Sequence, residues 1–260
     1  MKKTLLLLLL FSGVFAVAQP VKYTVANAHS HNDYEQLHPF WWAWNAGFGS
    51  IEADIFLVDG KLIVAHSQNE LAQNHSLDSL YLQPLQLVVR KNNGTPYTDK
   101  TKELQLLIDI KTDSVNTLNK LIEVLNQYPE IINNPLIKVA ITGNRPAQEY
   151  FTSYPSFIWF DGEAHKTYSE KALTKIVMLS DNFKNYSHWN GTEPLPTNDS
   201  IILKNAIDKA SMLKKKIRFW NAPDNTNSWK TLMRLGVGYI NTDHIQALEI
   251  FLKEYGSNYN

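Results

Sequence analysis

The 260-residue sequence contains no cysteine. Disulfide bonds and thiolate metal sites are therefore excluded, and any metal ion must be held by oxygen or imidazole ligands. The chain also has no excess of positive or negative charge, because 25 basic side chains balance 25 acidic ones. Nucleic-acid binding normally requires a basic field, so we expect no nucleic-acid partner. No long charge run or low-complexity tract interrupts the chain, and its hydrophobic content of 44% is ample for a globular core.

A long apolar run occurs at the start of the chain, in MKKTLLLLLLFSGVFAVA. Two lysines, an apolar stretch and a small-residue end are typical of a secretory signal. We therefore expect a signal peptide over residues 1–18, cleavage before Gln19, and export to the periplasm or the exterior. The alternative is an uncleaved membrane anchor, but the stretch is short for a spanning helix of ~20 residues.

Eight short β-rich runs recur along the rest of the chain. Several are apolar at consecutive positions, which is typical of parallel strands covered on both faces. Helix candidates at 114–128 and 199–216 lie between them. Eight strands alternating with helices predict an α/β fold, a single (β/α)₈ TIM barrel over residues 19–260. The expected strands cover residues 24–29, 50–56, 104–110, 137–142, 157–161, 176–180, 216–221 and 237–243.

A β-hairpin is predicted where the Asp-Gly pair at 59–60 stands between two apolar runs. The hairpin would fold His66 back toward the strand that carries Glu52. Two segments, 67–103 and 181–198, look longer than a barrel needs, and we interpret both as rim loops around the mouth.

Three carboxylates follow predicted strands. Glu52 and Asp54 are two residues apart, so their side chains project to the same face of one strand, and Asp109 ends the next long strand. Paired carboxylates repel each other, and a hard divalent cation relieves the repulsion by binding both. The three residues are therefore candidate metal ligands.

Two histidines also emerge at strand ends, His29 after TVANA and His66 after LIVA. Cleavage of a phosphodiester needs one group that takes a proton from the attacking hydroxyl and another that protonates the leaving oxygen. Imidazole does either near neutral pH. Two histidines beside three carboxylates are better explained as an acid and base pair than as structural residues.

The motifs AHSHNDY, IEADI, LIVAH and LIDIKTD together resemble those of the glycerophosphodiester phosphodiesterase and PI-specific phospholipase C-like barrel superfamily. The resemblance is closest to its sphingomyelinase-D-like and fungal mitochondrial-inheritance-type branches. It covers mainly residues 25–112, and the late GVGYINTD segment is similar to the last strand of that superfamily.

The resemblance implies a phosphoric diester hydrolase that acts on a small-molecule or lipid phosphodiester, either by hydrolysis or through a cyclic phosphate. It implies one divalent cation, Mg²⁺ or Ca²⁺, and it does not imply a protein partner. By position, it implies His29 and His66 as the acid/base pair, Glu52, Asp54 and Asp109 as the cation ligands, and Lys111 as a phosphate contact.

The first motif departs from the superfamily pattern. The usual His-Arg-Gly is His29-Ser30-His31 here, so the arginine that would help to hold the phosphate is missing. His31 or Asn32 is the candidate replacement. Because His31 lies two residues after His29 and shares its face, the sequence leaves open which of the two histidines is catalytic.

Aromatic and polar residues at other strand ends are further candidates. Trp220 ends a predicted strand, and we expect it to wall the substrate pocket. The WWAW run at 41–44 is expected to pack on a first helix, whereas an exposed run would contact lipid headgroups peripherally. Asn144 and Arg145 follow the fourth strand and are candidates for the mouth.

Two other functions fit parts of the sequence. His29 and His31 also resemble the metal motif of amidohydrolases and polymerase-histidinol-phosphatase-type enzymes, in which His165, His188 and Asp243 would complete a Zn²⁺ or Mn²⁺ site. That alternative leaves the Glu-x-Asp motif without a role. The other alternative is a non-catalytic barrel that binds a sugar or a lipid headgroup.

Overall fold

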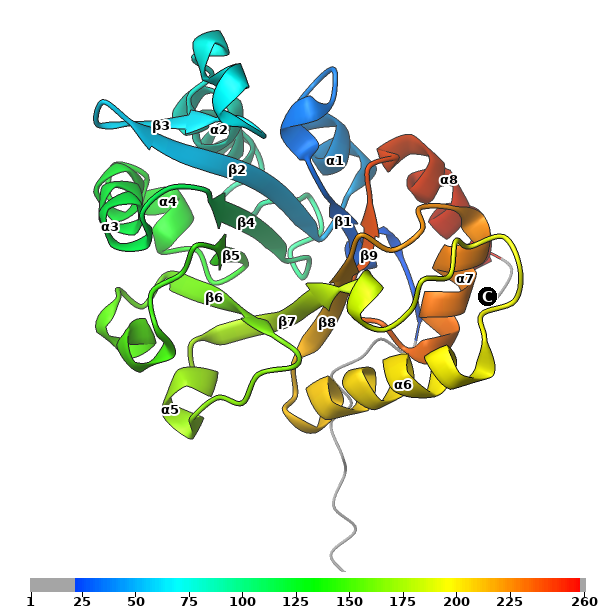
Figure 1. The fold of residues 1–260 in the computed structure, drawn as a ribbon. Coiled ribbons are helices and arrows are strands. Elements are labelled where there is room, and N and C mark those ends of the chain that lie inside the picture. The colour runs from blue at the N-terminus through cyan, green and yellow to red at the C-terminus, as the bar shows by residue number, and fades with distance from the viewer. Residues whose placement is uncertain (1–21, 258–260) are drawn as a thin grey trace, which may run out of the picture.

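The computed structural model describes residues 22–257, so the signal peptide expected over 1–18 lies outside the described residues. Eight parallel strands form one sheet in the order β8-β7-β6-β5-β4-β2-β1-β9, and a bridge between Arg218 and Tyr239 joins its two ends into a barrel (Figure 1). The predicted (β/α)₈ fold is confirmed. The parallel strands are β1 (Ala28–Ser30), β2 (Ser50–Val58), β4 (Leu104–Ile110), β5 (Ile137–Gly143), β6 (Ile158–Glu163), β7 (Ile176–Asn182), β8 (Lys216–Trp220) and β9 (Ile240–Thr242).

Helices surround the barrel in the connections between strands (Figure 1). Within residues 22–257, no helix is both long and apolar enough to cross a membrane. The α-helices are α1 (Trp41–Ala46), α2 (Gln83–Lys91), α3 (Ser114–Leu125), α4 (Pro129–Ile132), α5 (Glu170–Leu173), α6 (Thr197–Met212), α7 (Thr226–Leu235) and α8 (Ile245–Ser257). Short helical turns are η1 (Val25–Asn27), η2 (Asp33–Glu35), η3 (Gln68–Gln73), η4 (Asp78–Leu82), η5 (Gln148–Ser153) and η6 (Phe183–Asn185).

The predicted hairpin forms between β2 and the antiparallel strand β3 (Lys61–Val64). Both turn residues have positive φ angles, 47° at Asp59 and 74° at Gly60. These values are those of a type I′ turn, which asparagine, aspartate and glycine accommodate best. The hairpin directs the chain after β3 back to the end of the sheet where Asp54 lies.

The first strand begins four residues later than predicted. The Thr24 side chain accepts a hydrogen bond from the backbone of Ala26, and the Asn27 side chain accepts one from the backbone of Thr24, which closes a helical turn over Val25–Asn27. Local polar capping overrides the β propensity of this stretch.

The interpretation of 67–103 as a rim loop is wrong for its middle part. Helix α2 occupies this connection, with its proline at the first turn and its buried residues Leu85, Val88 and Val89 on one face. The short apolar stripe was obscured by the glycine and proline that follow it. The segment is mainly a crossover that covers the barrel wall.

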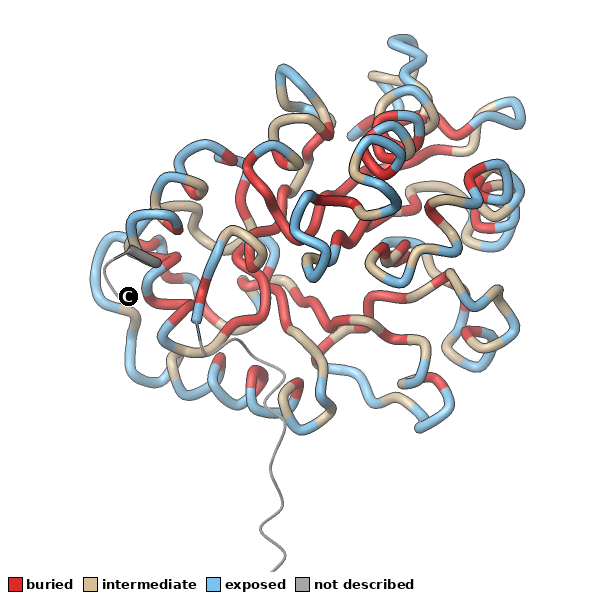
Figure 2. The backbone as a smooth tube through the Cα atoms, turned by 180° about the vertical axis from the view of Figure 1, so that it is seen from behind, coloured by how far each residue is buried: buried red, intermediate tan, exposed pale blue. Residues whose placement is uncertain are grey.

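The main core lies between the barrel wall and the helices. The strands are buried along most of their length, whereas the outer faces of the helices are exposed (Figure 2). Trp41, Trp42 and Trp44 pack partly buried against this core, as predicted for a first helix. A small separate apolar cluster is formed by Leu107, Ala140, Met178 and Tyr239. Polar side chains occupy the inward positions toward the carboxyl ends of the strands.

Candidate active site

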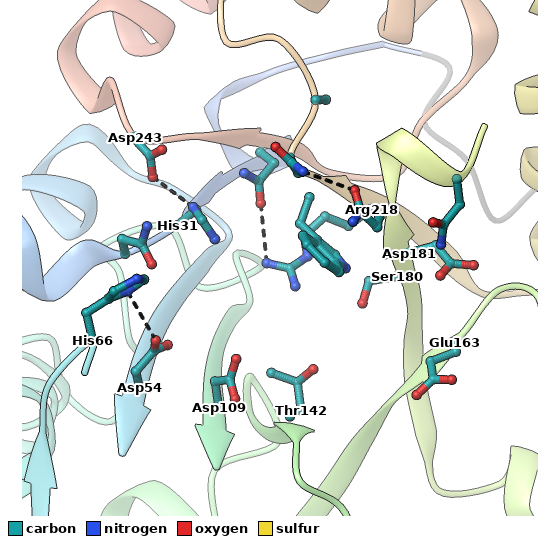
Figure 3. Close-up of a pocket in the computed structure, with 18 of the residues that line it drawn as sticks. His31, Asp54, His66, Asp109, Thr142, Glu163, Ser180, Asp181, Arg218 and Asp243 are labelled. Carbon is teal, nitrogen blue, oxygen red and sulfur yellow. Dashed lines mark hydrogen bonds and ion pairs between the residues drawn. The ribbon is translucent and has the colours of Figure 1, made fainter. Parts of the chain in front are cut away.

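A cavity of about 760 Å³ opens at the carboxyl ends of the parallel strands. In TIM barrels this end carries the catalytic residues. His31, Asp54 and His66 lie at one side of the cavity, and Glu163 and Asp181 lie at the other (Figure 3).

The three predicted carboxylates converge. Glu52 and Asp54 share the inward face of β2, and Asp54 is paired in register with Asp109 on β4. One ligand atom from each of the three residues lies within 4.8 Å of the others. Strand pairing therefore brings together groups that lie far apart in the sequence.

The charge at this cluster is incompletely balanced by protein groups. Lys111 Nζ lies 2.9 Å from an oxygen of both Asp54 and Asp109, but the Oδ1 atom of each carboxylate is buried without a protein partner. Burial and the charges of Glu52 and Asp109 raise the pKa of Asp54 to about 7. Unpartnered carboxylate oxygens in a set made only of oxygen donors fit a hard cation such as Mg²⁺ or Ca²⁺.

The structure places His29 below the cavity rather than in its lining. The imidazole is fully buried, with Nε2 2.7 Å from Glu52 Oε2 and Nδ1 2.8 Å from Ser50 Oγ. Burial and the charge of Arg218 lower the pKa of His29 to about 4, so the ring is neutral near pH 7. His29 therefore supports the Glu52 side chain from beneath.

Arg218, from β8, is a site residue that the sequence did not single out. Its Nη1 atom lies 2.5 Å from Glu52 Oε2, and this charge holds the pKa of Glu52 well below its usual range although burial alone would raise it. The side chain is 3% exposed, lines the cavity, and has no protein partner for its Nε atom. One sequence feature points to Arg218: it lies two residues before Trp220 on a predicted strand, so the two side chains share one face.

His31 lines the cavity and is paired with a carboxylate from the other end of the chain. Its Nδ1 atom lies 2.8 Å from Asp243 Oδ1, across 212 residues of sequence. Burial alone would lower the pKa of His31, but the hydrogen bond to Asp243 and the charge of Glu52 outweigh it, and the pKa is raised. A carboxylate accepts the proton on Nδ1, which leaves Nε2 for exchange of a proton in the cavity.

His66 follows the hairpin and faces the same end of the cavity (Figure 3). Its side chain is half exposed, and its Nδ1 atom lies 3.0 Å from the Tyr34 hydroxyl. Tyr34 donates to Asp54 Oδ2 at 2.8 Å, so this phenol connects the predicted catalytic histidine to a predicted cation ligand. No local sequence pattern points to Tyr34, which lies in η2, the short turn after β1.

The other predicted residues occupy the lining. Asn32 lines the cavity with a left-handed φ of 45°, and its Oδ1 atom is 3.0 Å from the Tyr34 hydroxyl. Trp220 is 39% exposed and forms part of the wall, as expected. Arg145 also lines the cavity, whereas Asn144 donates to the Thr112 carbonyl instead.

The residues of the amidohydrolase-like alternative do not form one cluster, although His31 pairs with Asp243. His165 Nδ1 lies 3.0 Å from Asp181 on β7, and His188 is exposed and outside the cavity lining. Within residues 22–257, the one group of side chains with suitable spacing for a metal contains carboxylates and no histidine. The geometry therefore favours the carboxylate cluster over a histidine-rich transition-metal site.

Comparisons with known proteins agree with the motifs. The model of the AIM6-like phosphodiesterase domain matches residues 20–133, and that of the glycerophosphoryl diester phosphodiesterase family matches residues 216–246. The altered inheritance of mitochondria protein 6 homolog of Arthroderma benhamiae is 27% identical over 84% of this chain and 81% of its own length. Its counterpart in Lachancea thermotolerans is 28% identical over 86% of this chain and 65% of its own length.

A solved structure shares the fold. The crystal structure of a glycerophosphodiester phosphodiesterase from Parabacteroides distasonis aligns with a TM-score of 0.53 and 14% sequence identity, over 91% of this chain and 97% of that one. The predicted resemblance is confirmed.

Proposed function

We propose that this chain, which is similar to the glycerophosphodiester phosphodiesterase-like superfamily in its motifs and its fold, is an exported, metal-dependent phosphodiesterase. Its substrate would be a glycerophosphodiester or a phospholipid-type phosphodiester. The observation that carries the proposal is the pair of unpartnered, buried Oδ1 atoms on Asp54 and Asp109, beside two imidazoles at the cavity wall. A metal-dependent phosphodiesterase uses such a cation site next to an acid and a base.

The cation would be held by Glu52, Asp54 and Asp109. When bound, it would supply positive charge to a non-bridging oxygen of the phosphate. Lys111 is placed to contact the same phosphate, since burial alone would lower its pKa but the charges of Asp54 and Asp109 raise it and keep the ammonium protonated. Arg218 lines the cavity, and its guanidinium would take the place of the arginine that the first motif lacks.

We assign the acid/base pair to His31 and His66 instead of His29 and His66. His31 and His66 both line the cavity, whereas His29 is buried with both ring nitrogens engaged. One imidazole would accept a proton from the attacking hydroxyl while the other protonates the leaving oxygen, which typically contributes about 10²- to 10⁴-fold to the rate.

The test is a panel of phosphodiesters, from bis(p-nitrophenyl) phosphate to glycerophosphodiesters, lysophospholipids and sphingomyelin, with and without Mg²⁺. We expect metal-dependent cleavage of at least one of them. His31→Ala and His66→Ala should each lower kcat by about 100-fold or more. His188→Ala removes an exposed histidine outside the cavity and should retain full activity.

Three outcomes would contradict the proposal. Turnover that does not depend on metal would show that the carboxylates do not act through a cation. Equal turnover in wild type and His66→Ala would show that His66 is not part of the acid/base pair. Ligand binding without turnover in metal-supplemented protein would favour the non-catalytic barrel.

A further inference from the structure

A second cavity opens at the amino ends of the barrel strands, opposite the candidate active site. Its volume is about 210 Å³, below the range of about 300–1,000 Å³ that holds drug-sized ligands, so it fits a small ion or molecule. We call it the amino-end cavity. Its polar lining consists of Glu103, Gln105, Lys138, Lys214, Lys216 and Tyr239.

An apolar layer separates the amino-end cavity from the candidate active site. On β4, Gln105 lines the amino-end cavity, Leu107 is fully buried, and Asp109 lines the active-site cavity. Strand β5 repeats this order with Lys138, Ala140 and Thr142. Residues two apart share one face of a strand, so these side chains form successive layers in the barrel interior. The two cavities are therefore distinct sites.

The amino-end cavity carries an excess of positive charge. Its lining holds three lysine ammoniums and one carboxylate, that of the exposed Glu103. Within residues 22–257, none of the three lysines forms an ion pair with a carboxylate; Lys138 Nζ donates to the Pro135 carbonyl at 3.2 Å, and Lys216 Nζ donates to the Tyr239 hydroxyl at 3.1 Å. Like charges around one recess repel each other and attract an anion, which relieves the repulsion.

Tyr239 supplies a buried donor to the same cavity. The residue is 5% exposed, and the Lys216 ammonium lies over its ring, 4.5 Å from the centroid, as well as against its hydroxyl. The hydroxyl oxygen accepts from Lys216, and no residue in the described part of the chain accepts the hydroxyl proton. A buried hydroxyl proton normally has an acceptor. An anion in the cavity would provide it, because its oxygens accept from both phenol and ammonium donors.

We propose that the amino-end cavity binds a small multivalent oxyanion of the phosphate or sulfate class. The ammonium groups of Lys138, Lys214 and Lys216 and the Tyr239 hydroxyl hold it. Because Tyr239 is buried in the lining, the ion must enter the recess to reach it, so the ligand is a free ion rather than a phosphate presented by a membrane. This inference does not depend on the proposed function.

Calorimetric titration and amide resonance shifts in NMR spectra test the site. The probes are inorganic phosphate, sulfate and chloride, each in the presence of a chelator, so that no divalent cation holds the anion in the candidate active site. We expect phosphate and sulfate to shift the resonances of Gln105, Lys216 and Tyr239. Chloride should bind at least about tenfold more weakly, because it carries one charge and reaches fewer donors at once.

Four variants distinguish a built site from diffuse attraction to lysines. Lys216→Gln should lower the phosphate affinity at least about tenfold, the usual cost of one charge-assisted hydrogen bond. Tyr239→Phe removes only the hydroxyl and should lower it about threefold. Glu103→Gln removes a repelling carboxylate and should raise it about threefold. Lys171→Gln, at an exposed position of α5 outside the cavity, is the matched control and should not change it.

Resonance shifts confined to residues of the candidate active site would overturn the inference. So would a phosphate affinity that is unchanged in both Lys216→Gln and Tyr239→Phe. Thermal unfolding checks that the variants fold. If Lys216→Gln does not fold, Lys214→Asn carries the test, because asparagine suits the left-handed φ of 56° at that exposed position.

Sedimentation with vesicles of phosphatidylcholine and phosphatidic acid tests the source of the phosphate. We expect no binding to the vesicles through this cavity. Vesicle binding that is lost in Lys216→Gln but kept in Lys171→Gln would overturn the assignment to a free ion.

Discussion

His31 and Asp243 connect the first strand of the barrel to the last through a 2.8 Å contact between Nδ1 and Oδ1. The backbone makes the same connection, since the His31 amide donates to the Thr242 carbonyl at 3.0 Å. Asp243, which directly follows the last strand, therefore orients the imidazole of His31 at the cavity.

Asp243→Asn should weaken activity and move its pH dependence. Removing the carboxylate lowers the raised pKa of His31, so the limb of the kcat/KM profile that His31 sets should move to lower pH. We expect an activity loss of about 10- to 100-fold, the usual cost of removing the partner of an active-site histidine. Asp208→Asn, on the exposed face of α6, is the matched control. An unshifted profile would show that Asp243 has no such role.

Gly143→Ala should disturb the cation site through Asp109. A Cβ atom at Gly143 would lie 1.9 Å from Asp109 Oδ1 and 2.7 Å from the Ile110 carbonyl, and the φ angle is +69°. Gly60→Ala has a similar φ of +74° but nothing within 4 Å, so it shares the backbone strain of about 1 kcal/mol without the clash. We expect a cation affinity at least about tenfold lower in the first variant only. Equal affinities in a Ca²⁺ titration would contradict this geometry.

Cation binding should depend on pH in the acidic range. The pKa of Asp54 is raised to about 7, so below that value a cation must displace a proton, and the apparent affinity should fall by up to about tenfold per pH unit. Above pH 7 the apparent affinity should level off.

Excess Mg²⁺ or Ca²⁺ at 100 times Kd should stabilise the fold by about 2.7 kcal/mol. Thermal unfolding with and without a chelator measures this stabilisation. If the chelator still lowers the unfolding temperature of the double variant Asp54→Asn/Asp109→Asn, the assignment of these residues as cation ligands is disproved.

Asp33 should make folding stability fall as the pH rises. Burial raises its pKa to about 6, although Ser30, Phe40 and Tyr81 donate to its oxygens. The folded state thus holds the proton more tightly than the unfolded state, and this stabilisation is complete below about pH 4 and lost as pH passes 6.

Comparison with Asp33→Asn isolates the effect of that carboxyl. The free energy of unfolding of wild type minus that of Asp33→Asn should decrease by about 2 to 3 kcal/mol between pH 4 and pH 7. Urea unfolding at each pH measures it, with Asp208→Asn as the exposed control. A difference that does not vary with pH would mean that Asp33 is not the group responsible.

Much of the fold was predictable from local sequence patterns. Eight β-rich runs mark the eight parallel strands, and several of these runs are apolar at consecutive positions because both of their faces are buried. The Asp-Gly turn predicts the β2–β3 hairpin. The start of β1 was not predictable, because side-chain capping competes there with the β propensity of the stretch. Helix α2, in 67–103, was not predictable either, because its short apolar stripe lies beside residues typical of turns.

For the site, the sequence by itself determined which carboxylates could meet, because Glu52, Asp54 and Asp109 lie on neighbouring parallel strands with their side chains on the same face. Only the tertiary structure shows how His29, in β1, and His31, just after it, differ in position. Residues two apart on an inward-facing strand lie at different depths in a barrel, so His29 is buried beneath Glu52 while His31 reaches the cavity. Likewise, Arg218 meets Glu52 across 166 residues, a contact that depends on barrel closure and that no local pattern encodes.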